Sequence, residues 1–313
     1  MIEGYENYLE EMSELNLETD DKYILTDRKK RSVEAELLLI KAYENKDYTR
    51  ISHYLIKQAN IQKEFLQPFY FDKAQYQIIT HFYKKSDKNA QGGLAYLQGL
   101  FEHAQFEFSL GCTEFDDFAG KEFDRLKHLK CAFTLFRKNV EESKKRDEFE
   151  AGYYISRIKM WECASIIGEL RSKPKMILNA ISEIKTFLDA DDYNSDDKDN
   201  YWSFVRYFIA RCYLYLYKIK PDAQLLDEGI GSIQKNLNYL KDTETVIFHG
   251  ENVALYSEFL MLKYNVEKTN VILQKALDCV NNALEIFTYF EASQTEIDKC
   301  SERQEKIVNL LAG

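Results

Sequence analysis

The residues best suited to chemistry in this sequence are the aromatic and basic side chains at positions 206–218, "RYFIARCYLYLYK". Four tyrosines, one phenylalanine and one cysteine occupy thirteen positions, with Arg206 and Arg211 among them. Tyrosine and arginine supply much of the binding energy at interfaces, because each combines contact area with a polar group. The stretch is too short for a membrane span, which needs about 20 apolar residues. It indicates either a binding surface or packing between helices.

Histidine and cysteine, the usual metal ligands, are scattered along the chain. The five histidines stand singly, without the HExxH pattern of zinc enzymes. His103 and His128 fall on neighbouring predicted helices and could meet in the fold. The six cysteines form no CxxC pair, so we expect reduced, mostly buried thiols in a cytoplasmic protein. We expect no metal and no cofactor.

Sequence signatures of known catalytic sites are also lacking. The segment "AQGGLAY" at 90–96 has two glycines but not the Lys-Ser/Thr of a phosphate-binding loop, and no GxSxG pattern occurs. We therefore expect a protein without catalysis of its own. Because helices bring distant carboxylates together, an enzyme or effector with an unrecognised site stays open as an alternative.

Charge is unevenly distributed. The net charge of −10 works against general binding of nucleic acid or anionic lipid.

The segment 189–199, "DADDYNSDDKD", resembles a calcium loop from Asp192 onward, but Asp197 and Ser203 replace its required glycine and glutamate. We expect a solvated loop there. The basic cluster "TDRKKRS" at 26–32 predicts a solvated helix start capped by Thr26 or Asp27.

One segment allows a nucleic-acid interpretation. Residues 51–66 could form a helix-turn-helix with Asn60 in the turn, although Ile56 would crowd the helix crossing. A DNA-binding regulator that reads with residues 47–71 is therefore a second alternative function.

These residues must be positioned by helices. Only 3 prolines and 12 glycines occur in 313 residues, and apolar residues recur at steps of three and four. Pro174 and Pro221 mark helix starts, and Gly250 marks a turn. From residue 93 the segments form pairs, which we expect at 93–111 with 122–143, 151–170 with 174–190, 200–219 with 222–242, and 250–267 with 269–292.

The first segments of the last three pairs begin about 50 residues apart, which is typical of a helical-hairpin solenoid. We therefore predict an all-α protein with three parts. Residues 1–90 would form an N-terminal helical bundle with segments at 3–15, 31–45, 48–66 and 69–85. Residues 91–292 would form the solenoid, and residues 293–313 a C-terminal capping helix.

The hairpins resemble tetratricopeptide (TPR) repeats. With Ala210 as the small residue of the repeat's first helix, Tyr213 stands three positions on, where the family favours tyrosine. The family's full motif is absent, and the spacing exceeds its usual repeat of about 34 residues. The layout is also similar to that of bacterial Rap-type peptide-responsive regulators. This resemblance implies a solenoid that binds a short peptide in its concave groove and shifts its N-terminal bundle in response.

On this alignment the first helices direct aromatic and polar side chains toward the concave side. We expect a scaffold or regulator that binds a protein or peptide there, with arginines pairing to its carboxylates. The sequence leaves open whether the chain forms a homo-oligomer. The predicted partner-binding residues are Tyr154, Arg157, Trp161, Phe204, Tyr207, Arg211, Tyr215, Asn252 and Tyr256.

Overall fold

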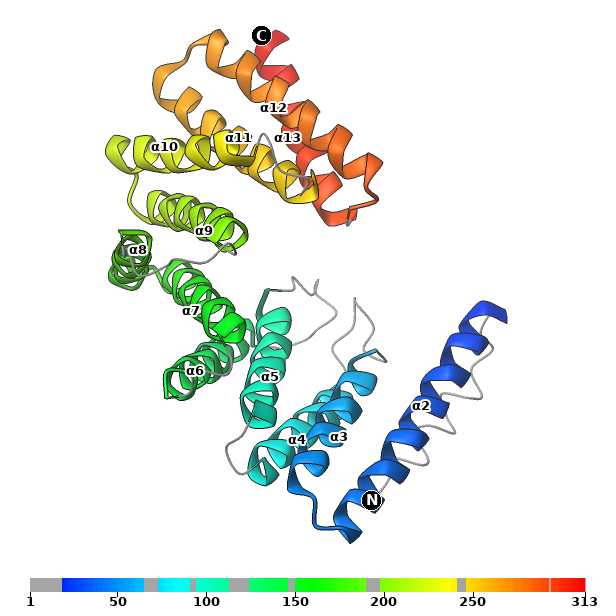
Figure 1. Cartoon of the computed structure of the whole chain (residues 1–313). Helices are drawn as coiled ribbons and strands as arrows, with labels where there is room; N and C mark the ends of the chain where they lie inside the picture. Colours follow the sequence, from blue (N-terminus) through cyan, green and yellow to red (C-terminus); the bar gives the residue numbers. More distant parts are fainter. Residues whose placement is uncertain are drawn as a thin grey trace. The chain divides into compact units, whose positions relative to one another are not determined.

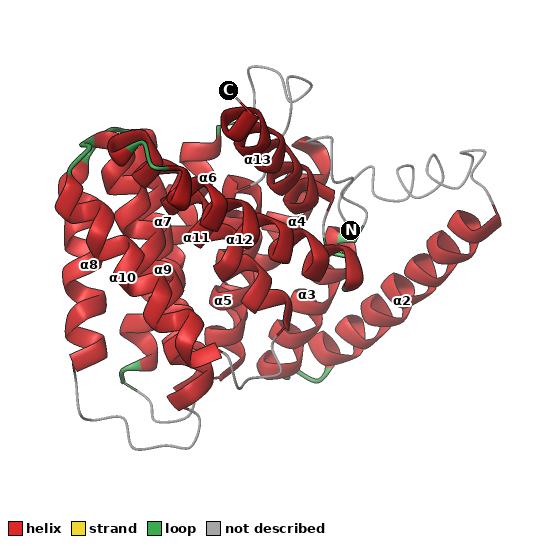
Figure 2. Cartoon of the chain, turned by 90° about the horizontal axis from the view of Figure 1, so that it is seen from above, coloured by secondary structure: helices red, strands yellow, loops and turns green. Residues whose placement is uncertain are grey.

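The computed structural model describes residues 19–64, 73–90, 94–112, 124–145, 150–189, 198–240, 246–292 and 294–312. Within these ranges every regular element is an α-helix and no strand occurs (Figure 2). The all-α prediction is confirmed. The predicted segment 3–15, the glycines of "AQGGLAY" and most of the acidic segment 189–199 lie outside the described residues.

The chain forms two compact units, Met1–Arg157 and Ile158–Gly313, and the division falls inside one helix, α7 (Glu150–Leu170). The first unit contains α2 (Thr19–Glu44), α3 (Tyr48–Lys63), α4 (Lys73–Asn89), α5 (Leu94–Cys112), α6 (Arg125–Ser143) and the start of α7. The second contains the rest of α7 with α8 (Pro174–Asp189), α9 (Lys198–Ile219), α10 (Ala223–Leu240), α11 (Val246–Glu267), α12 (Asn270–Tyr289) and α13 (Gln294–Ala312).

In the first unit, each helix from α2 to α6 packs against the next (Figure 1). The closest pairs are α3 with α4 and α5 with α6, and both α3 and α4 also contact α5. A buried cluster that includes Ile56, Ile79 and Phe106 joins these helices. The expected N-terminal bundle therefore continues into the first hairpin through a shared core.

In the second unit, each helix from α8 to α13 packs against the next, and α9 also contacts α11 (Figure 1). The closest pairs are α9 with α10 and α11 with α12, as expected for helical hairpins. Gly229 permits the close approach of α10 to α11, because an added Cβ would lie 2.4 Å from a ring carbon of Phe259. This packing fixes the faces of α9 and α11 that carry predicted site residues.

Helix ends follow local chemistry. The Asp124 carboxylate accepts a hydrogen bond of 3.0 Å from the Lys127 backbone N–H and caps α6. Pro174 is the first residue of α8, as predicted, where its missing N–H leaves no bond unmade. Tight connections between described helices use residues in the left-handed region, at Lys46, Ser172, Lys268 and Glu291.

Three local predictions are wrong. The basic cluster 26–32 lies inside α2, so Thr26 and Asp27 cap no helix start, and Asp27 pairs with Arg31 at 2.9 Å instead. The helix α3 runs unbroken through Asn60, so the turn of the helix-turn-helix interpretation is absent there. The side chain of Asn60 accepts a hydrogen bond from Tyr83.

The third correction concerns Gly250, which lies inside α11 and not in a turn. An added Cβ at this position would lie 2.9 Å from Ile286 and from the Phe287 ring. The glycine is explained by the close approach of α12, because a larger residue would push the two helices apart.

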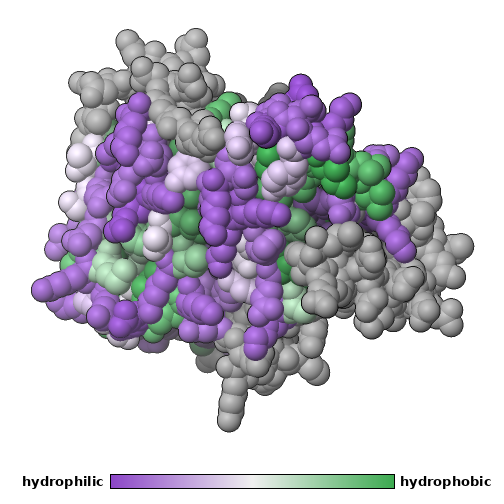
Figure 3. Space-filling model, turned by 90° about the horizontal axis from the view of Figure 1, so that it is seen from below, coloured by the Kyte–Doolittle hydropathy of each residue, from purple (hydrophilic) through white to green (hydrophobic). Residues whose placement is uncertain are grey.

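On the face shown in Figure 3, the surface of the described residues is mostly hydrophilic, with hydrophobic residues exposed between hydrophilic ones. Among the described residues, α2 exposes the largest group of apolar side chains: Val33, Leu37, Leu38, Ile40 and Tyr43. Ala35 and Leu39, on another face of this helix, are buried against the rest of the unit.

Candidate functional site: an arginine cluster on α9

The stretch at 206–218 lies on α9 and divides its side chains between packing and an open face. Ile209, Ala210 and Tyr213 are at most 4% exposed and pack against neighbouring helices, as predicted. Arg211 keeps 30% of its side chain exposed. Phe204 lies two turns earlier and is 43% exposed. Positions 204, 207, 211 and 215 are spaced by three or four residues, so they share one face of the helix.

Arg211 is the centre of this face. Its Nη1 lies 3.2 Å from Glu162 Oε1 on α7, and its Nη2 donates a hydrogen bond of 2.5 Å to the Tyr215 hydroxyl. The guanidinium carbon lies 5.8 Å from the ring centre of Tyr207 and 5.5 Å from that of Tyr215. Two aromatic rings and one carboxylate therefore fix the orientation of the guanidinium.

A second cation completes this Arg211 cluster, which we define as Lys159, Glu162, Tyr207, Arg211 and Tyr215. The Lys159 ammonium lies 2.9 Å from Glu162 Oε2, so the two carboxylate oxygens bind two different cations. The Glu162 side chain is only 6% exposed, whereas that of Lys159 is 25% exposed. Both oxygens of the Glu162 carboxylate are thus paired within the protein, whereas Lys159 and Arg211 each keep part of the side chain exposed to solvent.

The electrostatic environment keeps the hydroxyls of the cluster protonated. Burial raises the pKa of Tyr215 to about 12, against the opposing effect of Arg211. Burial also raises the pKa of Tyr207. On α11, burial and the nearby Glu296 raise the pKa of Glu251, while Arg211 opposes them. Neither tyrosine can act as a phenolate near neutral pH, so these hydroxyls serve as hydrogen-bonding groups.

Four of the predicted site residues are at most 8% exposed and lie in packing: Trp161, Tyr215, Asn252 and Tyr256. Trp161 is 2% exposed, and its Nε1 donates to Glu183 on α8 at 2.8 Å. Asn252 is fully buried, and its Oδ1 accepts a hydrogen bond of 2.6 Å from Asn236 on α10. These polar groups hold helices of the second unit together.

Tyr256 is 5% exposed, and its hydroxyl accepts a hydrogen bond of 2.6 Å from Gln234 on α10. The predicted residues Tyr154 and Arg157 belong to the first unit, whereas the Arg211 cluster belongs to the second. The Arg157 Nη1 donates to the Tyr153 hydroxyl at 3.3 Å. The structure therefore brings together Tyr207, Arg211 and Tyr215, with Phe204 at one end of their stripe.

A second cluster, in the first unit, was not predicted as a unit. Glu107 on α5 is 1% exposed and accepts hydrogen bonds from Tyr76 at 2.9 Å and from His128 at 2.7 Å. His103, one turn earlier, lies 3.6 Å from the same carboxylate. We call these four residues the Glu107 cluster. The spacing of His103 and Glu107 is the sequence signal that could have found it.

The Glu107 cluster has the properties of a structural group. Burial opposes ionisation, but the contacts with His103, His128 and Tyr76 outweigh it and lower the pKa of Glu107 to about 2. Burial and the charge of Glu107 raise the pKa of the adjacent Cys131 thiol to about 12. Because the thiolate is the reactive form, this cysteine is a poor nucleophile.

Across the described ranges, no three His, Cys, Asp or Glu side chains are placed to hold a metal ion. None of the described helices is long and apolar enough to cross a membrane. No protein-family model matches the chain, and no curated protein sequence shows significant similarity to it.

Proposed function

We propose that the second unit binds a protein or peptide segment, with the Arg211 cluster at the centre of the binding surface. The main support for this proposal is the combination of contacts and exposure at Arg211. Its guanidinium is oriented by Glu162 and Tyr215, yet 30% of the side chain stays exposed. A guanidinium has five N–H donors, so donors remain for a carboxylate or carbonyl of a partner.

An aromatic surface next to Arg211 supports the same function. The exposed Phe204 ring packs on Phe248 of α11 with ring centres 4.4 Å apart, and the Tyr207 ring lies 5.4 Å from Phe248. Phe204 is 43% exposed and Tyr207 partly exposed, and aromatic side chains beside an oriented arginine are typical of residues that dominate binding energy. A bound segment would place apolar side chains on these rings and a carboxylate on Arg211.

The two alternative functions have less support. The unbroken α3 removes the turn on which the DNA-binding interpretation depends. The buried Glu107 would be the natural acid–base residue of an enzyme, but its 1% exposure keeps substrate from reaching it. No observation in the described residues favours either alternative over recognition of a protein segment.

The test is selection of peptides from a displayed random twelve-residue library by the immobilised full chain. We expect enriched peptides whose affinity falls at least about tenfold in Arg211→Gln, since a charged contact is lost. Arg206→Gln is the matched control, because Arg206 lies on the same helix over the Tyr239 ring. Circular dichroism would verify that both variants fold. Equal affinity of wild type and Arg211→Gln would refute the proposal.

A further inference from the structure

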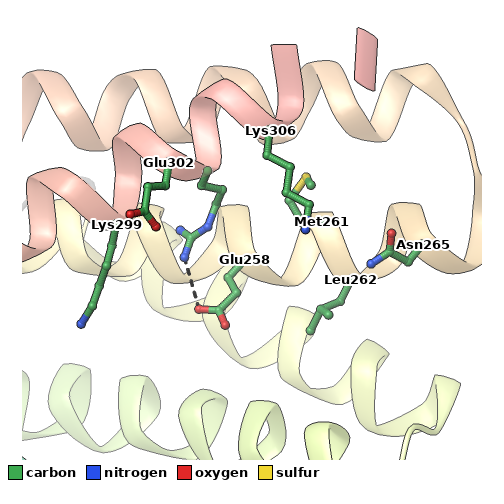
Figure 4. Close-up of a pocket in the computed structure, with 8 residues that line it drawn as sticks. Glu258, Met261, Leu262, Asn265, Lys299, Glu302 and Lys306 are labelled. Atoms are coloured by element: carbon green, nitrogen blue, oxygen red, sulfur yellow. Dashed lines mark hydrogen bonds and ion pairs between the residues drawn. The ribbon is translucent and has the colours of Figure 1, made fainter. Parts of the chain in front are cut away.

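A groove between α11 and α13 lies in the same unit and has its own chemistry (Figure 4). Each helix contributes one stripe with the spacing i, i+3, i+4, i+7, at positions 258, 261, 262 and 265 of α11 and 299, 302, 303 and 306 of α13. Its volume is about 360 Å³, which is at the small end of ligand sites. Both helices pack on α12, which holds them in place.

One wall of this α11–α13 groove is fixed by Arg303. Its Nη1 donates to the Ala254 carbonyl at 2.8 Å and to the Ser257 hydroxyl at 2.9 Å, and its Nη2 lies 3.4 Å from Glu258. The dashed line that ends at Glu258 in Figure 4 marks this last contact. The Glu258 carboxylate also pairs with Lys218 of α9 at 3.1 Å. Glu258 is therefore neutralised by two cations before any ligand enters.

Two further cations line the groove without strong partners. Lys299 is exposed, and its one ion pair within the described ranges is with Glu296, at 3.7 Å. Lys306 is exposed and has no ion pair among the described residues. Glu302 is the remaining acidic residue of the lining. With Glu258 already neutralised, Lys299 and Lys306 against Glu302 leave the lining with a surplus of one positive charge, on a chain whose net charge is −10.

The floor of the groove is apolar. Met261 is 7% exposed, and Leu262, beside it, is partly buried. Asn265 follows at the end of the α11 stripe, with an amide that can both donate and accept hydrogen bonds. Methionine adapts its shape to different apolar partners, which suits a site for a side chain of a ligand.

The dimensions indicate a short peptide segment. Seven residues of helix separate the ends of each stripe, a length of about 10 Å, which is about three residues of extended chain. The groove also adjoins the binding surface proposed above. Lys218, which binds Glu258, lies on α9 two helical turns beyond Arg211, or about 10 Å away. One segment could therefore reach both places.

We propose that the α11–α13 groove is the subsite for an acidic and apolar stretch of the bound peptide. An apolar side chain of the peptide lies on Met261 and Leu262, and a neighbouring Asp or Glu pairs with Lys299 and Lys306. This assignment rests on the proposed function, because it names the chemistry of the segment that the second unit binds. It deepens that function by predicting which peptides bind.

The first experiment is the composition of peptides selected from a displayed random library by the wild-type chain. We expect enrichment of Asp or Glu next to Leu, Met or Phe relative to the unselected library. Selected peptides that are neutral or basic would overturn the subsite. Absence of any enriched peptide would overturn both this inference and the proposed function.

The second experiment measures the affinity of one selected, fluorescein-labelled peptide by anisotropy. Lys306→Glu and Lys299→Glu should each weaken binding at least about tenfold, because an attraction becomes a repulsion. Lys235→Glu is the charge-matched control on the exposed side of α10 and should change affinity less than about twofold. If Arg211→Gln abolishes binding while both groove variants bind normally, the proposed function stands and the subsite is refuted.

Discussion

The Glu107 and Arg211 clusters each consist of one charged group held by contacts with other polar side chains. They differ in how far that central group is exposed to solvent. In the first unit, one carboxylate receives two hydrogen bonds from neighbouring helices and is 1% exposed. In the second unit, one guanidinium is held by a carboxylate and a tyrosine hydroxyl, but stays 30% exposed. The first central group is closed to solvent, whereas the second is partly exposed to it.

This difference in exposure predicts that the Glu107 cluster contributes mainly to stability and the Arg211 cluster mainly to recognition. A buried charge that loses a partner costs several kcal/mol, because water cannot replace the lost contact. A partly exposed charge that loses a partner costs much less, since water replaces part of the interaction. We therefore expect changes at Glu107 to affect folding most, and changes at Arg211 to affect binding most.

The largest effect is expected for Glu107→Gln. The substitution keeps the shape of the side chain but removes the charge that Tyr76 and His128 contact, so we expect a loss of about 3 kcal/mol in unfolding free energy. Glu102→Gln on the same helix is the control, because its pair with Lys63 at 3.5 Å is partly exposed and should contribute less than about 1 kcal/mol. Urea denaturation measures both. Equal losses would mean that the cluster is not a special stabilising group.

The same cluster predicts a dependence on pH. The folded pKa of Glu107, about 2, lies below its ordinary value of 4.5, so the folded state favours the ionised form. Its stabilisation is complete above pH 4.5 and is lost as pH falls toward 2. In acid titrations, the wild type should therefore lose more stability over this range than Glu107→Gln. Parallel curves for the two proteins would contradict this account.

The second-largest loss of stability is expected from a change at Gly229 of α10, which packs closely against α9 and α11. Gly229→Ala places a methyl group 2.4 Å from the Phe259 ring and 3.2 Å from Tyr213 Cβ, so we expect a loss of about 2 kcal/mol from overpacking. Gly231→Ala, two residues later on α10, meets nothing within 4 Å. It should raise stability by up to about 1 kcal/mol through helix propensity. Thermal denaturation would show opposite shifts, and shifts of the same sign would refute the close approach.

The third effect compares one hydroxyl from each cluster. Tyr76→Phe removes a donor to a buried carboxylate and should cost about 1.5 kcal/mol. Tyr215→Phe removes an acceptor from Arg211, which can turn toward water, and should cost about 0.5 kcal/mol. Chemical denaturation of both variants gives the difference directly. A larger loss for Tyr215→Phe would reverse the assignment of structural and accessible clusters.

Helices can be predicted well from the sequence, because a helix buried along one face repeats apolar residues at steps of three and four. Ile209, Ala210 and Tyr213 could be assigned to packing because helical spacing places them together, and Pro174 could be assigned to a helix start by its missing donor. Gly250 was misassigned because its cause is not local. The glycine makes room for Ile286 on another helix, and no pattern near residue 250 records that contact.

Site residues were harder to predict for the same reason. Asn252 and Arg211 both seemed suited to binding a partner by residue type, but the partner of Asn252 is Asn236, on the preceding helix. The Glu107 cluster depends on three helices, so the sequence indicated only that His103 and His128 could meet and gave no sign that Glu107 and Tyr76 would join them. Periodicity shows which face of a helix a residue occupies, whereas pairing across helices needs the fold.

The smallest effect on stability is expected for Arg211→Gln. Glu162 keeps Lys159 as a partner at 2.9 Å, so its carboxylate is not left without a cation. The loss in unfolding free energy should therefore stay below about 1 kcal/mol, far less than for Glu107→Gln. Urea denaturation and peptide affinity, measured on the same samples, separate the two roles. A loss as large as that of Glu107→Gln would make Arg211 a structural residue and remove the main support for a binding surface on α9.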